Sequence, residues 1–240
     1  MIKPILITAL SFGTLLSGDV DENMPSRIMP ASETCEIPHM AFQAGESLTY
    51  KVYYNWGSVW LSGGEVYFKL TKEDYKGKPV LHASGEAVSY KSFDWLFKVR
   101  DKVDTYMNEE TLQSYKFSRD VYEGGYTFYR SYDWDREKNI IYSYQDNRKG
   151  KKTSKTITNV DPCGLDLMTT FYWMRTLDIA NAKKGDKIPV KMAIDDEEYD
   201  MYVRYEGKEV YETKLGKFNC IKLKPLLQEG EIFKEGEGMR

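Results

Sequence analysis

Residues 161–190 read DPCGLDLMTTFYWMRTLDIANAKKGDKIPV, and they contain the only segment of this sequence that predicts a helix of any length. Asp161-Pro162 is typical of a helix start, because proline fits the first turn and an aspartate accepts from its unpaired N–H groups. The apolar residues between Leu165 and Leu177 go most of the way round a helix, which leaves no wide face for water. The stretch therefore predicts one buried helix over about residues 166–180.

The sequence on both sides of this helix alternates between apolar and polar residues, as strands do. The clearest case is LTYKVYYNW at 48–56, where the apolar and aromatic residues hold the even positions. Similar patterns follow at 59–62, 65–70, 80–90, 99–108, 112–122, 126–134, 139–145 and 153–160, and after the helix at 188–194, 198–205, 208–213, 218–223 and 231–239. Turn residues separate them regularly, which favours antiparallel neighbours, and so many strands require a sheet that curls. The predicted fold is mainly β: a large, strongly curved antiparallel sheet or partly open barrel wrapped around one central helix.

The chain is expected to have three parts. Residues 1–18 have a lysine, a short apolar run and then small residues, which predicts a secretory signal peptide, and no other segment is apolar enough for a membrane-spanning helix. Residues 19–41 have scattered prolines and charges and predict a flexible leader. Residues 42–240 are expected to form a single β-rich domain. Its final strand pattern runs to the last residues without a stop signal, so we expect the last strand or strands to be missing.

Composition places the chain among ordinary globular proteins, since 41% of its residues are hydrophobic and 30% are charged. Its formal net charge of −3 argues against a nucleic-acid partner, because no basic stripe outweighs the surrounding acids. We expect no cofactor and leave the oligomeric state open.

Candidate ligand-binding residues come from the helix and the first strand. Phe171, Met174 and Arg175 lie on the helix segment, and Tyr54 and Trp56 lie on the apolar face of the first strand pattern. Arg175 has an acid three positions later, Asp178, so the two are expected either to form a buried pair lining a pocket or to reach water at the rim of the helix.

Three cysteines allow at most one internal disulfide. Cys163 and Cys220 are both flanked by apolar residues, so they are the pair we expect if a disulfide forms. Three inert thiols fit the sequence equally well. No histidine accompanies the cysteines, which argues against a metal site.

Catalytic patterns are weak. The two histidines, His39 and His82, have no nucleophile motif beside them, which argues against hydrolytic triads. Asp133 and Asp135 share one face of a strand and are the candidate acids if the protein acts on carbohydrate. The acidic run at 195–198 is expected to be a solvated turn.

Several short segments resemble one known family. They are FQAGESLTY at 42–50, EGG at 123–125, DP at 161–162, FYWMR at 171–175, Gly185 with IPV at 188–190, VRYEGKEV at 203–210, Thr213, GKF at 216–218 and Lys222. With these segments the chain resembles the bacterial domain of unknown function 3108 family, from residue 42 to the end. The family usually continues past EGM at 237–239 into a tryptophan-containing strand, a departure that fits the expected missing strand. The resemblance implies a β-rich exported envelope protein and supplies no catalytic residues.

These observations predict an exported, non-catalytic envelope protein in the periplasm or at the outer membrane. It is expected to bind an apolar or envelope-derived ligand, or another envelope protein. The alternative is a carbohydrate-active enzyme that uses paired acids on its strands.

Overall fold

The protein is described from a computed structural model, which covers residues 27–28, 35, 37–56, 59–147, 152–213 and 215–227. It is mainly β, with a large antiparallel sheet of eight strands in simple sequential order. The strands of this sheet are β1 (Ser47–Trp56), β2 (Val59–Tyr75), β3 (Lys78–Ser89), β4 (Arg100–Met107), β5 (Ser114–Glu123), β6 (Tyr126–Asp135), β7 (Ile140–Asn147) and β8 (Lys152–Asn159).

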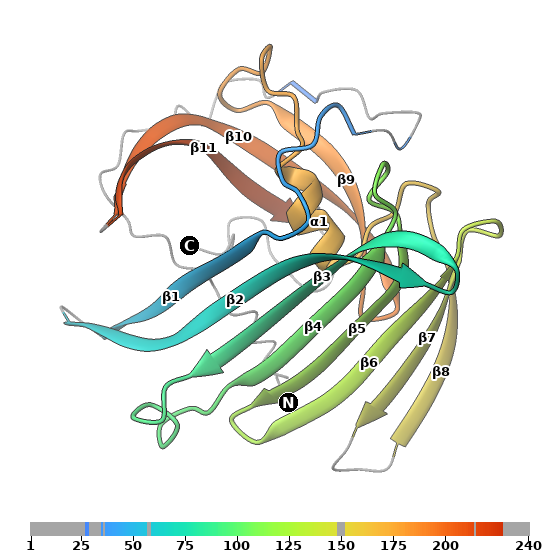
Figure 1. Cartoon of the computed structure of the whole chain (residues 1–240), viewed down its shortest axis with the longest axis horizontal. Coiled ribbons are helices and arrows are strands. Elements are labelled where there is room, and N and C mark those ends of the chain that lie inside the picture. Colours follow the sequence, from blue (N-terminus) through green and yellow to red (C-terminus); the bar gives the residue numbers. More distant parts are fainter. Residues whose placement is uncertain are drawn as a thin grey trace.

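A second antiparallel sheet of three strands follows the helix. Its order is β11-β10-β9, built from β9 (Lys187–Ile194), β10 (Glu197–Thr213) and β11 (Gly216–Leu227). Figure 1 shows this sheet facing the concave side of the eight-stranded sheet, with the helix α1 (Leu167–Met174) between them. The large sheet is open and not a closed barrel, because among the described strands β1 pairs only with β2 and β8 only with β7.

Tight turns give the large sheet its sequential order. Gly124 and Gly125 join β5 to β6 with φ of 53° and 90°, and Lys76 and Gly77 join β2 to β3 with φ of 55° and 79°. Two successive residues with positive φ make the hairpin turn whose twist matches the flanking strands. The turn chemistry in the sequence therefore fixes antiparallel neighbours, as predicted.

The core lies between the concave face and α1. Period-two alternation places one side of each strand inward, and the buried side chains of the large sheet include Leu70, Met107, Phe117, Tyr132 and Ile141. Met168 and Tyr172 of α1 complete this cluster. Each fully buried side chain of this size contributes about 1.5–3 kcal/mol.

The helix is much shorter than predicted. It begins after Asp166, because the backbone of Leu165 hydrogen-bonds to β9 through Lys191 and Ala193 and so is withdrawn from the helix. It ends at Met174, where the N–H of Arg175 bonds to the carbonyl of Tyr172 in a tightened last turn. The prediction of a helix over 166–180 was therefore right in position and wrong in length.

Parts of the predicted leader are attached to the folded chain. Ile28 forms a parallel bridge with Lys187, and Arg27 makes a 2.7 Å ion pair with Asp186. The predicted signal peptide at 1–18, the final strand at 231–239 and most of residues 19–34 lie outside the described residues.

Candidate functional site

Three of the five predicted ligand-binding residues share one face of α1. Phe171, Met174 and Arg175 are spaced by three and four residues, and all three side chains are half-buried. Tyr54 and Trp56 lie in the last part of β1, beyond a bulge between Val52 and Tyr53, and their side chains are outside the described part of the structure. Phe171 packs against the core of the large sheet, whereas Met174 packs against that of the three-stranded sheet. The two strand residues lie at the far end of β1.

Aromatic rings from both sheet and helix form a continuous row beside α1. The ring of Phe171 stacks on that of Phe68 with centroids 4.8 Å apart and an interplanar angle of 12°. Phe68 in turn meets Tyr50 edge-on at 6.0 Å. All three side chains are half-buried on the concave face of the sheet. We call Tyr50, Phe68 and Phe171 the aromatic face. Met174 packs instead against the buried cluster of the three-stranded sheet.

Arg175 lies at the rim of the aromatic face and is paired with Glu46. Its two terminal nitrogens each donate to Glu46 at 2.7 Å, a bidentate ion pair that raises the pKa of Arg175. The guanidinium also lies 5.1 Å from the ring centroid of Phe42. Asp178 instead accepts from the N–H of Ala180, so the alternative of a buried Arg175–Asp178 pair is not formed. Tertiary contact with the start of β1 decided this pairing.

The disulfide also differs from the prediction. Cys163 is bonded to Cys35, with Cα atoms 5.0 Å apart, whereas Cys220 is a free, half-buried cysteine on β11. The expected Cys163–Cys220 pair was therefore wrong. Cys35 lies in a polar segment, and the disulfide fastens this segment to the turn before α1.

A buried carboxylate fixes the start of α1. Asp166 is fully buried and caps the helix, accepting from the N–H of Thr169 at 2.8 Å, while Thr169 Oγ1 accepts from the N–H of Asp166. It also accepts from the hydroxyls of Thr105, at 2.9 Å, and Ser114. Burial raises the pKa of Asp166, and these donors oppose that shift. The network attaches α1 to β4 and β5.

Arg136 joins the same region from the end of β6. Its Nε donates to the carbonyl of Ser114 at 2.9 Å and its Nη1 to that of Gly164 at 3.1 Å. The guanidinium lies 3.9 Å from the ring centroid of Trp134, and burial lowers the pKa of Arg136 to about 10. These contacts with backbone carbonyls give Arg136 a positioning role for the turn before α1.

The turn between β9 and β10 docks on the concave face through Asp195. Its carboxylate accepts from Arg119 of β5 at 2.9 Å and from Arg130 of β6. The two arginines are cross-strand partners on the inward side of their strands. The turn was predicted to be solvated, and Asp195 and Glu197 are indeed exposed. The prediction missed the ion pairs of Asp195, which bind the turn to the large sheet.

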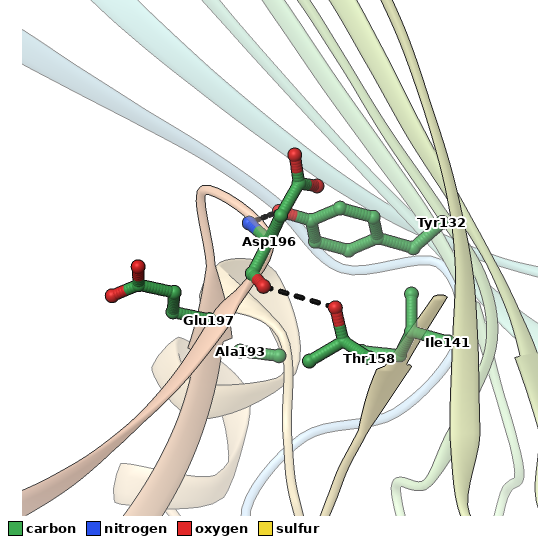
Figure 2. Close-up of a pocket in the computed structure, with 6 residues that line it drawn as sticks. All are labelled: Tyr132, Ile141, Thr158, Ala193, Asp196 and Glu197. Carbon is green, nitrogen blue, oxygen red and sulfur yellow. Dashed lines mark hydrogen bonds between the residues drawn. The ribbon is translucent and has the colours of Figure 1, made fainter. Parts of the chain in front are cut away.

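Asp196 extends this joint to the next strands. Its carboxylate accepts from Ser143 of β7, its carbonyl accepts from Thr158 of β8 at 2.9 Å, and its N–H donates to the hydroxyl of Tyr132 at 3.3 Å. Figure 2 shows the last two bonds beside a shallow crevice lined by Tyr132, Ile141, Thr158, Ala193, Asp196 and Glu197. The crevice has no room for a water molecule, so this region is a joint between the two sheets.

A pair of acids lies close to the joint. Burial, and then the charge of Asp101, raise the pKa of Glu123 to about 8, while Arg119 opposes the shift. Burial likewise raises the pKa of Asp101, which accepts from the N–H of Tyr122 at 2.9 Å. At neutral pH Glu123 is therefore mainly protonated.

The other candidate groups face outward. Asp133 and Asp135 alternate with the buried Tyr132 and Trp134, so they lie on the convex side. A hydrogen bond from Lys138 lowers the pKa of Asp135, which is unfavourable for a general acid. His82 has Nδ1 2.8 Å from Glu73 and Nε2 3.0 Å from Asp104, so carboxylates hold both of its ring nitrogens.

Comparison with models of known protein families identifies the family of this chain. A family model described as "Protein of unknown function (DUF3108)" matches residues 49–240. The chain belongs to the DUF3108 family. No curated protein and no solved structure matches it. In this DUF3108 protein the matched region contains the aromatic face and the joint, whereas Cys35 and Glu46 precede it.

No helix in the described part of this DUF3108 protein is long and apolar enough to cross a bilayer. Within the same residues, no group of three or more histidine, cysteine or acidic side chains is arranged to hold a metal ion.

Sequence reasoning missed the residues that join the elements. Arg119 and Arg130 alternate with apolar residues on the inward side of their strands. A charged residue at such a position is a sequence signal that the charge is paired inside the protein. Asp166 and Thr169 have the spacing of a capping box. The predicted start at about residue 166 agrees with this capping box, although Asp161-Pro162 was taken as the start signal.

Proposed function

We propose that this protein is an exported, non-catalytic protein of the cell envelope that binds an apolar ligand on the aromatic face. The N-terminal pattern of a signal peptide and the family resemblance support export. The Cys35–Cys163 disulfide supports it independently, because disulfides persist in oxidising compartments.

The observation that carries the binding proposal is the half-exposure of a stacked aromatic row. Tyr50, Phe68 and Phe171 lie on a face whose neighbouring core side chains are fully buried, yet they keep part of their rings in water. Aromatic side chains that line a concave face and are only partly buried are typical of ligand sites. The central position of α1 within the curved sheet is part of this proposal, because the helix supplies Phe171.

The ligand's chemistry follows from the rim of this face. Arg175 is already neutralised by Glu46, so a free anionic group would have to compete with a bidentate carboxylate. The main contribution is therefore expected from an apolar chain or ring that covers the aromatic face. The crevice of Figure 2 has no room for a ligand, so the site is assigned to the aromatic face and not to the joint.

A fluorescence titration with cis-parinaric acid tests the proposal. The wild-type protein is expected to bind saturably, and Phe171→Ala to bind about tenfold more weakly, since one aromatic contact is worth about 0.5–1.5 kcal/mol beyond area burial. Tyr142→Ala is the matched control, because Tyr142 is an exposed aromatic on the convex face. Tyr50→Ala serves as a second variant if Phe171→Ala fails to fold.

Two results would contradict the proposal. One is a folded wild-type protein that neither binds the probe nor retains a ligand in native mass spectra. The other is an intact N-terminus on protein recovered from the cytosol, which would remove the export claim.

A further inference from the structure

The distal halves of β10 and β11 form a two-stranded ribbon. β9 pairs with β10 only from Glu197 to Arg204, whereas β11 continues to pair with it as far as Thr213. Beyond a bulge between Tyr205 and Gly207, the two strands therefore run without a third strand from the described part of the chain. We call residues 207–213 and 215–222 the ribbon. In Figure 1 it curves away from β9 and α1 towards the left end of the long axis.

The ribbon exposes large apolar side chains at its turn and on both faces. Leu215 at the turn is 89% exposed, Val210 60%, Ile221 51% and Phe218 47%. The register places Val210 and Ile221 on one face, and Phe218 opposite Tyr211 on the other. By contrast, Met201 and Val203 earlier in the same strand are buried. The apolar residues of the ribbon are thus not part of a core.

Lysines surround these apolar side chains. The segment from 208 to 222 has four lysines and two glutamates, so its formal charge is positive in a chain whose net charge is −3. Lys217 lies 3.7 Å from Glu212 and Lys222 lies 3.3 Å from Glu209, and exposed pairs of this kind are weak. Lys208 has no acidic partner among the described residues, so the excess positive charge is available to a partner.

We propose that the ribbon docks the protein on an anionic lipid bilayer. Leu215 and Phe218 would enter the head-group region, and the lysines would lie at the level of the lipid phosphates. Apolar side chains combined with lysines are the features of an interfacial anchor, because the apolar part gains by burial and each lysine is attracted by the anionic surface.

A second hairpin lies at the same end of the molecule. The joined ends of β1 and β2 also reach the left end of the long axis in Figure 1, and Leu61 near this end is exposed. Two hairpins with apolar residues at one end suit a flat surface better than a peptide groove. Lysines on the ribbon also disfavour pairing with a strand of another protein.

Sedimentation with lipid vesicles tests this docking with the full chain. The wild-type protein is expected to pellet with vesicles that mix phosphatidylcholine and phosphatidylglycerol, weakly with phosphatidylcholine alone, and less as salt is raised. Leu215→Asp combined with Phe218→Asp should reduce binding by at least about tenfold. Lys208→Glu combined with Lys217→Glu should reduce only the binding that depends on phosphatidylglycerol.

The matched control is Ile157→Asp. Ile157 is a 65% exposed apolar residue on β8, outside the ribbon, and its substitution should leave vesicle binding unchanged. All of these sites are exposed, so circular dichroism and thermal melting are expected to match the wild type.

Four outcomes would overturn the proposal. They are no pelleting of the wild-type protein, equal binding to both vesicle types, wild-type binding by the doubly substituted ribbon, and a dimer that dissociates on the same substitutions without vesicle binding. The last would assign the ribbon to a protein interface. The proposal is independent of any ligand on the aromatic face.

Discussion

The Cys35–Cys163 disulfide is expected to contribute strongly to stability. It joins residues separated by 128 positions, so reduction frees a very long loop in the unfolded chain. The loop-entropy relation gives about 5 kcal/mol for a loop of this length, and measured losses are more often about 2–4 kcal/mol. A loss of about 3–5 kcal/mol lowers Tm by on the order of 10 °C for a chain of this size.

Urea denaturation of cysteine variants measures this loss. Cys35→Ser and Cys163→Ser should lower the free energy of unfolding equally, and a reductant should bring the wild-type protein to the same value. Cys220→Ser is the control, because Cys220 is a free thiol. The reasoning is refuted if Cys220→Ser causes the larger loss, or if peptide mapping finds Cys163 bonded to Cys220.

Two further predictions concern the joint. Asp195→Ala removes the acceptor shared by Arg119 and Arg130, and it should lower the free energy of unfolding in urea by about 1–3 kcal/mol. The control is Asp133→Ala, because Asp133 is an acid on the convex face, and its free energy of unfolding should stay within about 0.5 kcal/mol of the wild type. Equal losses in the two variants would contradict the docking role of Asp195. The pKa of Glu123 is raised from its ordinary 4.5 to about 8 in the folded protein. Between these two pH values the folded protein keeps a proton that the unfolded chain has released. The free energy of unfolding therefore falls as pH rises from about 4.5 to about 8. Glu123→Gln should flatten that fall in urea midpoints measured across the window, and an unchanged slope would count against the shifted pKa.

The concave surface was only partly predictable. The spacing of Phe171, Met174 and Arg175 places them on one helix face, and this held in the shorter helix because three- and four-residue spacing needs only one turn. Their partners did not follow from sequence. Phe68 stacks on Phe171, and Glu46 forms an ion pair with Arg175. The partners in each contact are more than a hundred residues apart in the chain, and no local sequence pattern links such positions.

The sequence by itself determined the family, the antiparallel order of the strands and the place of the helix. These depend on local causes, namely side-chain alternation along each strand, residues that tolerate positive φ at the turns, and one apolar segment too long for a strand. The tertiary structure alone decided where the helix stops, the Cys35–Cys163 pair, and the docking of Asp195 on Arg119 and Arg130. Each of these features depends on contacts between residues that are distant in sequence. Which carboxylates and thiols pair depends on which of them the folded sheets bring within bonding distance.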